Sequence, residues 1–187
     1  MVCHTCRTRI GPLARADARY CSSRCRVHAH RRLAPQQLRD LDRWVRFAAD
    51  KRPLTIDGTS ASSTNSATWS TYLEAAASTA GVGVGFVLNG DGIVCVDLDH
   101  CVDGARLAGW AAELLAGCPA TFIERSVSGT GLHVWGTGNV GKGRVLRLAD
   151  GGVEVYGTGR YIAVTGRRWS TSPATLADLS GWLPGLV

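Results

Sequence analysis

Short apolar runs separated by glycine-rich turns fill most of this 187-residue chain after residue 80. Runs of four to seven residues with β-branched side chains, bounded by Gly, Asn and Asp, predict β-strands. We expect strands at residues 82–88, 93–99, 121–124, 132–135, 153–156 and 161–164. Residues 41–47 fit a strand or a helix, and we expect a strand that leads into a turn at 51–53. Asn89-Gly90 predicts a hairpin between the strands on either side of it.

Three helices are expected beside these strands, at residues 67–80, 105–116 and 174–183. Ser66 is the expected N-cap of the first helix, and Gly81 lies just past its end. Many strands with a few helices indicate an α+β domain, in which helices cover one face of a largely antiparallel sheet.

Composition places the chain among folded intracellular proteins. Hydrophobic residues make up 45% of it and charged residues 19%, which is enough for a packed core. No apolar run approaches the roughly 20 residues that span a bilayer, and cysteines and arginines occupy the N-terminus in place of a signal-peptide core. We expect a cytoplasmic protein with no membrane partner, divided into a small basic module at 1–35 and a larger domain at 36–187.

Four cysteines near the N-terminus have the spacing of a metal site: Cys3-x2-Cys6 and Cys21-x3-Cys25. Two such pairs offer four thiolates to one tetrahedral ion, so we expect a structural Zn²⁺. A reactive dithiol and chance spacing are the alternatives. We expect the other three cysteines, Cys95, Cys101 and Cys118, to be packed in or near the core.

The positive charge of the chain is concentrated in the same segment. Residues 1–35 contain eight arginines and one acid, Asp17, whereas residues 36–187 carry a net charge of −1. This asymmetry favours a polyanion such as nucleic acid as partner of the first segment. A solvated basic tail is the alternative.

Two aspartates close the most apolar predicted strand. Asp97 and Asp99 lie at i and i+2, so they share a face with Ile93 and Cys95 and lie roughly 6.5–7 Å apart at Cα. This arrangement suits one hard cation or a pair of them. A strand that has simply run into solvent is the alternative.

A turn of small residues comes directly before the strand at 132–135. Ser128, Gly129 and Gly131 can approach an anion closely, and His133 shares a face with Trp135. A triphosphate held by this turn, with His133 donating to a phosphate oxygen, is the functional interpretation. A purely structural histidine is the alternative.

A third acid and several cations complete the set of candidates. Glu154 matches a third metal ligand if its strand lies beside Asp97; otherwise it is an exposed position on a half-buried strand. We expect Lys142, Arg144 and Arg147 in a basic, glycine-rich loop and Arg160 at the start of the next strand. Cations there can neutralise phosphates. A solvated loop is the alternative, and it is favoured for Arg147.

Four segments in this order resemble a known family: 94–99 (VCVDLD), 128–133 (SGTGLH), 153–156 (VEVY) and 159–166 (GRYIAVTG). The series is similar to the bifunctional DNA primase/polymerase (prim-pol) domains of the archaeo-eukaryotic primase superfamily, found in phages, plasmids and mobile elements. Residues 61–75 and 83–88 agree with that family as well. The resemblance covers about residues 43–183, and the segment 15–26 resembles a short zinc ribbon.

This resemblance implies an RRM-like catalytic sheet and template-directed nucleotidyl transfer. It implies that Asp97, Asp99 and Glu154 bind two Mg²⁺ or Mn²⁺ ions, and that Ser128 and His133 grip the incoming dNTP or NTP. The template would be single-stranded or primed DNA, and a helicase would be encoded separately.

Two other functions fit the same residues. Two Asp, a Glu and a His also serve a metal-dependent nuclease, which does not need the turn at Ser128. A zinc-containing DNA-binding or replication-initiation protein without catalytic activity is the third possibility.

Overall fold

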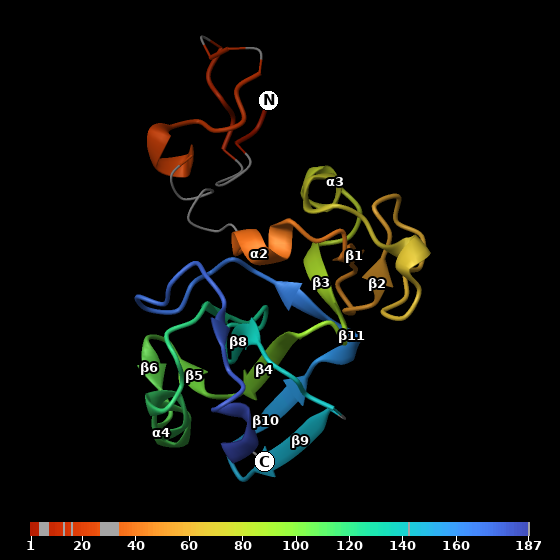
Figure 1. The fold of residues 1–187 in the computed structure, drawn as a ribbon. Helices are drawn as coiled ribbons and strands as arrows, with labels where there is room; N and C mark the ends of the chain where they lie inside the picture. The colour runs from red at the N-terminus through yellow and green to blue at the C-terminus, as the bar shows by residue number, and fades with distance from the viewer. Residues whose placement is uncertain (4–7, 13, 16, 27–33, 142, 187) are drawn as a thin grey trace. The chain divides into compact units, whose positions relative to one another are not determined.

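The computed structural model describes residues 1–3, 8–12, 14–15, 17–26, 34–141 and 143–186. The chain divides into two compact units, Met1–Leu33 and Ala34–Val187 (Figure 1). The first unit ends two residues before the boundary that we expected after residue 35.

The strands of the second unit form two main sheets. The four-stranded sheet has the order β11-β3-β1-β2, with β1 at Trp44–Phe47, β2 at Pro53–Leu54, β3 at Gly83–Asn89 and β11 at Thr158–Val164. The six-stranded sheet has the order β12-β8-β4-β10-β9, and β7 pairs with β8. Its strands are β4 (Ile93–Asp99), β7 (Ile123–Arg125), β8 (Leu132–Thr137), β9 (Arg144–Leu148), β10 (Gly151–Tyr156) and β12 (Ala177–Asp178). Of the strand pairs in these two sheets, only β12 with β8 is parallel within the described residues.

The helices of the second unit are short. They are α2 (Gln36–Arg39), α3 (Tyr72–Ala77) and α4 (Gly109–Ala116), with 3-10 turns at Ser66–Thr68 and Leu183–Gly185. The expected helix at 105–116 begins late because β5 (Val102–Asp103) and β6 (Arg106–Leu107) form a small ribbon before it.

The N-cap that we expected for the helix at 67–80 is wrong. Thr71 caps α3 instead: its hydroxyl accepts from the amide of Glu74, whose carboxylate accepts from the amide of Thr71 in return. This capping box starts the helix at Tyr72. Ser66 begins a separate 3-10 turn.

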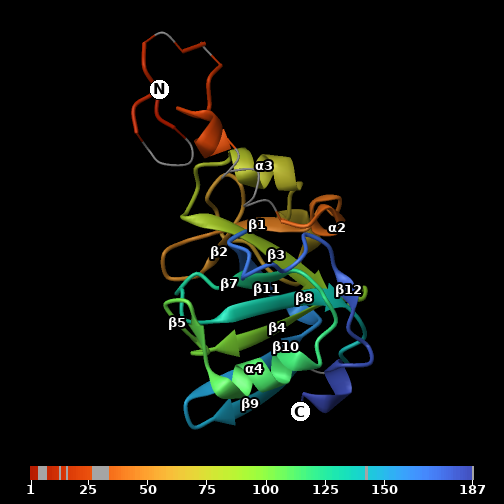
Figure 2. The same ribbon diagram turned by 90° about the vertical axis from the view of Figure 1, so that its left-hand side faces the viewer.

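Side chains on the two faces of the six-stranded sheet build two apolar layers. In Figure 2 the strands β8, β4 and β10 lie between the four-stranded sheet and helix α4. The layer between the two sheets contains Trp44, Phe86, Cys95 and Trp135. The layer on the other face contains alternate residues of β4, β8 and β10 and is covered by α4 and the C-terminal segment. The mixed α/β class and the largely antiparallel strands are as predicted, but the strands divide between two sheets where we expected one.

The hairpin predicted at Asn89-Gly90 is wrong. β3 pairs with β1 and β11, whereas β4 pairs with β8 and β10, so the turn carries the chain from one sheet to the other. Gly90 and Gly92 have φ of 89° and 96° in this turn, and the amide of Gly90 donates to Gly157 at 2.9 Å. Both strands are apolar on two faces, which suits separate buried sheets better than an isolated hairpin.

Two further expectations near the C-terminus are also wrong. The helix at 174–183 is replaced by β12 and a 3-10 turn, because the edge of β8 offers backbone partners: Leu179 donates to Thr137 at 2.8 Å. Arg144 and Arg147, which we expected in a loop, lie on the edge strand β9. Among the described residues, no helix combines the length and apolar character needed to cross a membrane.

Candidate active site

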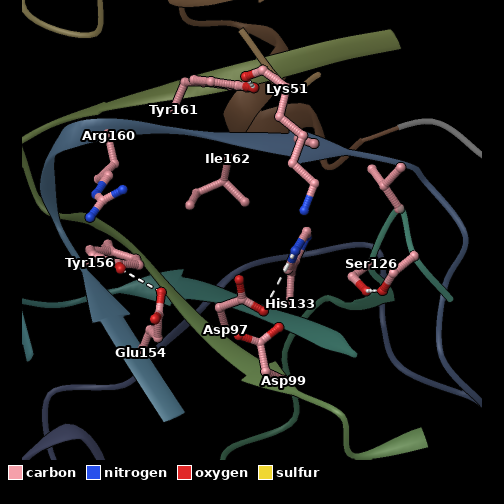
Figure 3. Close-up of a pocket in the computed structure, with 13 residues that line it drawn as sticks. Lys51, Asp97, Asp99, Ser126, His133, Glu154, Tyr156, Arg160, Tyr161 and Ile162 are labelled. Carbon is pink, nitrogen blue, oxygen red and sulfur yellow. Dashed lines mark hydrogen bonds and ion pairs between the residues drawn. The ribbon is translucent and has the colours of Figure 1, made fainter. Parts of the chain in front are cut away.

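Strand register brings the predicted acids and the histidine together on β4, β8 and β10. Asp97 on β4 lies opposite Glu154 on β10 on one side and opposite His133 on β8 on the other. Asp99 follows two residues later on the same face of β4. The structure therefore places the strand of Glu154 beside Asp97, the arrangement on which we made a third metal ligand conditional. Figure 3 shows the four side chains around one pocket.

The pocket has a volume of about 290 Å³ and is lined from both sheets. The six-stranded sheet contributes the acids, His133 and the turn at Ser126 and Ser128. The four-stranded sheet contributes Lys51, next to β1, and residues of β11 that include Arg160 and Tyr161. One wall is thus acidic and the other basic and aromatic.

The three carboxylates form a cluster that suits a hard cation. One oxygen each from Asp97, Asp99 and Glu154 lies within 4.8 Å of the others. Burial raises the pKa of Asp97 to about 6, with His133 opposing the rise and Asp99 and Glu154 adding to it. Asp97 Oδ1 is buried without a hydrogen-bond partner. An unpartnered carboxylate oxygen among two further carboxylates fits Mg²⁺ or Mn²⁺, which prefer oxygen ligands.

His133 is buried, with a carboxylate beside each ring nitrogen. Nδ1 donates to Glu124 Oε1 at 3.4 Å, and Nε2 lies 3.7 Å from Asp97 Oδ1. Burial lowers the pKa of His133, but the hydrogen bond to Glu124 and the charge of Asp97 outweigh it, so the pKa lies above its ordinary value. The ring therefore presents Nε2 toward the acids.

Glu124 is a functional candidate that the sequence analysis missed. Its carboxylate is fully buried and also accepts from Trp135 Nε1 at 3.1 Å, from the amide of Thr165 at 2.9 Å and from the amide of Gly166 at 2.6 Å. With so many donors this carboxylate is fixed, and it fixes the His133 ring in turn. The sequence signal for it was an acid that ends the short apolar run of residues 121–123.

The turn before β8 is closed by its own hydrogen bonds. The amide of Gly129 donates to the carbonyl of Ser126 at 3.1 Å, and that of Gly131 to Ser126 Oγ at 3.2 Å. A Cβ on Gly131 would lie 2.7 Å from the carbonyl oxygen of Leu98, so only glycine lets the turn approach β4 this closely. Ser128 lines the pocket and the two glycines do not. Its hydroxyl lies 3.0 Å from the hydroxyls of Ser126 and Thr130.

Aromatic side chains hold the side of the pocket next to Glu154. The hydroxyl of Tyr156 donates to Glu154 Oε2, and the guanidinium of Arg160 lies 4.8 Å from the centre of the Tyr156 ring. Burial, followed by the hydrogen bond to Glu154, raises the pKa of Tyr156 to about 12. The sequence analysis had not singled out Tyr156, Tyr161 or Lys51.

One predicted nucleotide contact, Arg144, is not brought to this pocket by the structure. Arg144 lies opposite Val155, whose side chain packs on the other face of the sheet, and it lines a different cavity with Val140 and Leu183. Lys142 lies outside the described residues. Arg160 is therefore the member of the predicted trio that the structure places in the pocket.

In the first unit, three of the four predicted zinc ligands converge. Cys3, Cys21 and Cys25 have sulfur atoms within 4.8 Å of one another, and Cys3 is buried. Cys6 lies outside the described residues. Three thiols at this separation suit a soft ion such as Zn²⁺.

Comparison with known families identifies the larger part of the chain. The sequence model of the family described as "Bifunctional DNA primase/polymerase, N-terminal" matches residues 28–182. The matched segment contains all four of Asp97, Asp99, His133 and Glu154. A search of the curated proteins finds no match to this chain.

Proposed function

Because the chain belongs to the bifunctional DNA primase/polymerase family, we propose that its second unit catalyses template-directed nucleotidyl transfer. The observation that carries this proposal is the meeting of three carboxylates beside Nε2 of His133 in one pocket. The substrates would be a nucleoside triphosphate and a single-stranded or primed DNA template. A separate strand-separating enzyme would supply that template during replication of a phage, plasmid or mobile element.

In this proposal Asp97, Asp99 and Glu154 hold two Mg²⁺ or Mn²⁺ ions. Such ions lower the pKa of an attacking 3′-hydroxyl and neutralise the triphosphate. The 3′-hydroxyl loses its proton to solvent water, its oxygen bonds to the α-phosphorus, and the bond from that phosphorus to the leaving pyrophosphate breaks. The remaining work of the chain is to align the reactants, which is the larger part of phosphoryl-transfer catalysis.

His133, Ser128 and Arg160 are the proposed triphosphate contacts. Nε2–H of the imidazole donates to a phosphate oxygen while Glu124 keeps Nδ1 occupied, so the ring cannot turn away. The Ser128 hydroxyl adds a donor from the turn. Arg160 supplies a charge from β11 on the opposite wall.

We further propose that the first unit is a structural zinc module bound by Cys3, Cys6, Cys21 and Cys25. The metal would supply most of the folding free energy of so short a segment. Its arginines would contact template phosphates without reading sequence.

Primer extension by the full chain tests the catalytic proposal. Purified protein is given primed or unprimed single-stranded DNA, dNTPs or NTPs, and Mg²⁺ or Mn²⁺. Replacing Asp97→Asn together with Asp99→Asn should reduce incorporation by at least about 1000-fold, since the metal sites carry several kcal/mol of transition-state stabilisation. Asp103→Asn, at an exposed position on β5, is the matched control.

The outcomes separate the three candidate functions. Unchanged incorporation by the double variant would refute the assignment. DNA degradation without affinity for dNTPs would indicate a nuclease. Salt-sensitive DNA binding with no incorporation in either metal would indicate a non-catalytic DNA-binding protein.

A further inference from the structure

Lys51 has a backbone conformation that its residue type disfavours. Its φ is 66°, and among the described residues only two other non-glycine residues, His100 and Ser170, have positive φ. A left-handed conformation costs a residue with a Cβ of order 1 kcal/mol, and lysine has no short polar side chain to offset that cost locally. Strain of this kind is retained where the side chain is needed in one direction.

The turn around Lys51 is fixed by hydrogen bonds at both of its backbone polar groups. Its amide donates to the carbonyl of Ala48 at 2.9 Å, and its carbonyl accepts from the hydroxyl of Tyr161 on β11. The amide of Ala48 donates to Arg52 at 2.9 Å, which closes the connection between β1 and β2. The position of Lys51 is therefore set by the four-stranded sheet.

The side chain of Lys51 crosses the pocket toward the acidic wall. Figure 3 shows it descending from beside Tyr161 toward His133 and Asp97. Its charge is one of the influences that lower the pKa of Asp97, against the larger effect of burial. Within the described residues, its ammonium group makes no hydrogen bond or ion pair. The neighbouring Arg52, by contrast, lies 3.7 Å from Asp50 and does not line the pocket.

Charge in the pocket is divided between the two sheets. Metal ions held by the acidic wall would neutralise only part of the charge of a triphosphate, and the lysine and arginine side chains that line the pocket come from the opposite wall. Lys51 and Arg160 are the two basic side chains there, and the Arg160 guanidinium is stacked on Tyr156. A compact ammonium with three donors is well suited to binding phosphate as a point charge.

We propose that Lys51 is a substrate-binding residue whose ammonium group binds the β- or γ-phosphate of the nucleoside triphosphate. This inference rests on the proposed function of the same pocket and adds to it a residue from the opposite sheet. In this assignment the turn fixes the backbone of Lys51 beside the pocket before the nucleotide arrives, so binding does not have to order this loop.

Lys51→Gly is the sharpest test because it separates the side chain from the turn. Glycine adopts positive φ without strain, so the melting temperature of the variant should equal or exceed that of the wild type. Affinity for dATP, measured by titration calorimetry on the full chain with Mg²⁺ or Mn²⁺, should fall about 10- to 100-fold, the value of one charged hydrogen bond. Affinity for dAMP, which lacks the β- and γ-phosphates, should not change.

Two matched variants sharpen the result. Lys51→Arg keeps the charge and should retain most of the affinity for dATP, whereas Arg52→Ala removes a neighbouring charge and should behave as wild type. In primer extension, Lys51→Gly should raise the KM for dATP, and Arg52→Ala should not.

The proposal would be overturned by wild-type dATP affinity in Lys51→Gly, or by equal losses for dATP and dAMP. Either result would leave the proposed function intact if the wild type still incorporates nucleotides. If the wild-type protein does not bind dATP in the presence of either Mg²⁺ or Mn²⁺, both proposals are overturned together.

Discussion

The two faces of β4 differ along the length of the strand. On the face toward α4, Val94, Val96 and Leu98 are all buried in one continuous apolar layer. The opposite face begins in the same way with buried Ile93 and Cys95 but ends with Asp97 and Asp99, where the pocket opens between the sheets. The first face stabilises the fold along its whole length, whereas the second gives up apolar burial near the acids and keeps an ionisable group with an unpartnered oxygen.

The largest expected effect on stability is at Glu124 on β7, opposite His133 on β8. Glu124→Gln replaces one acceptor oxygen with an amide that faces buried donors, including the backbone of Thr165 and Gly166. The free energy of unfolding should fall by about 3–5 kcal/mol, measured by urea denaturation. Glu113→Gln on the exposed side of α4 is the control. Equal stability of the two variants would contradict the anchoring of His133 described above.

A comparable loss is expected on the apolar face, without a loss of substrate affinity. Leu98→Ala should cost about 3 kcal/mol by leaving a cavity in a fully buried layer. The folded fraction should bind dATP as the wild type does, because the Leu98 side chain points away from the pocket. If Leu98→Ala changed the affinity for dATP strongly and left the stability unchanged, the two faces of β4 would not have the separate roles described above.

A smaller change, in this case an increase in the free energy of unfolding, is expected when Asp97 is replaced. The pKa of Asp97 is about 6 in the folded state, above the ordinary 3.8. The folded state therefore favours the protonated carboxyl more than the unfolded state does. The wild type has its full stability below about pH 4 and loses part of it as the pH rises through 6. Without divalent ions, Asp97→Asn should therefore be more stable than the wild type by about 1–3 kcal/mol at pH 7.5, and this difference should vanish toward pH 4.

Thermal unfolding with added metal sharpens this prediction. Mg²⁺ or Mn²⁺ should raise the melting temperature of the wild type much more than that of Asp97→Asn, since ligands that bind only the folded state stabilise it. A wild type that is the more stable of the two at pH 7.5 without metal would contradict the cost assigned to the buried carboxylate.

The sequence was sufficient to predict which face of its strand each site residue occupies. The faces of Asp97 and His133 follow from a period of two, and the family resemblance brought Glu154 to the same site. The partner of each strand does not follow from local pattern: Asn89-Gly90 has the composition of a hairpin, yet the strands on either side belong to different sheets. Lys51 was missed for the same reason, because only the packing of the second sheet over the first brings it to the acids.

The chain crosses between the two sheets at three places: from β3 to β4, from β10 to β11 and from β11 to β12. The first two crossings are joined by the hydrogen bond from Gly90 to Gly157. The third is fixed beside the pocket, where the amides of Thr165 and Gly166 donate to Glu124. A molecule that binds both Lys51 and the acidic wall would add one more link between the sheets, and its binding free energy would stabilise their packing.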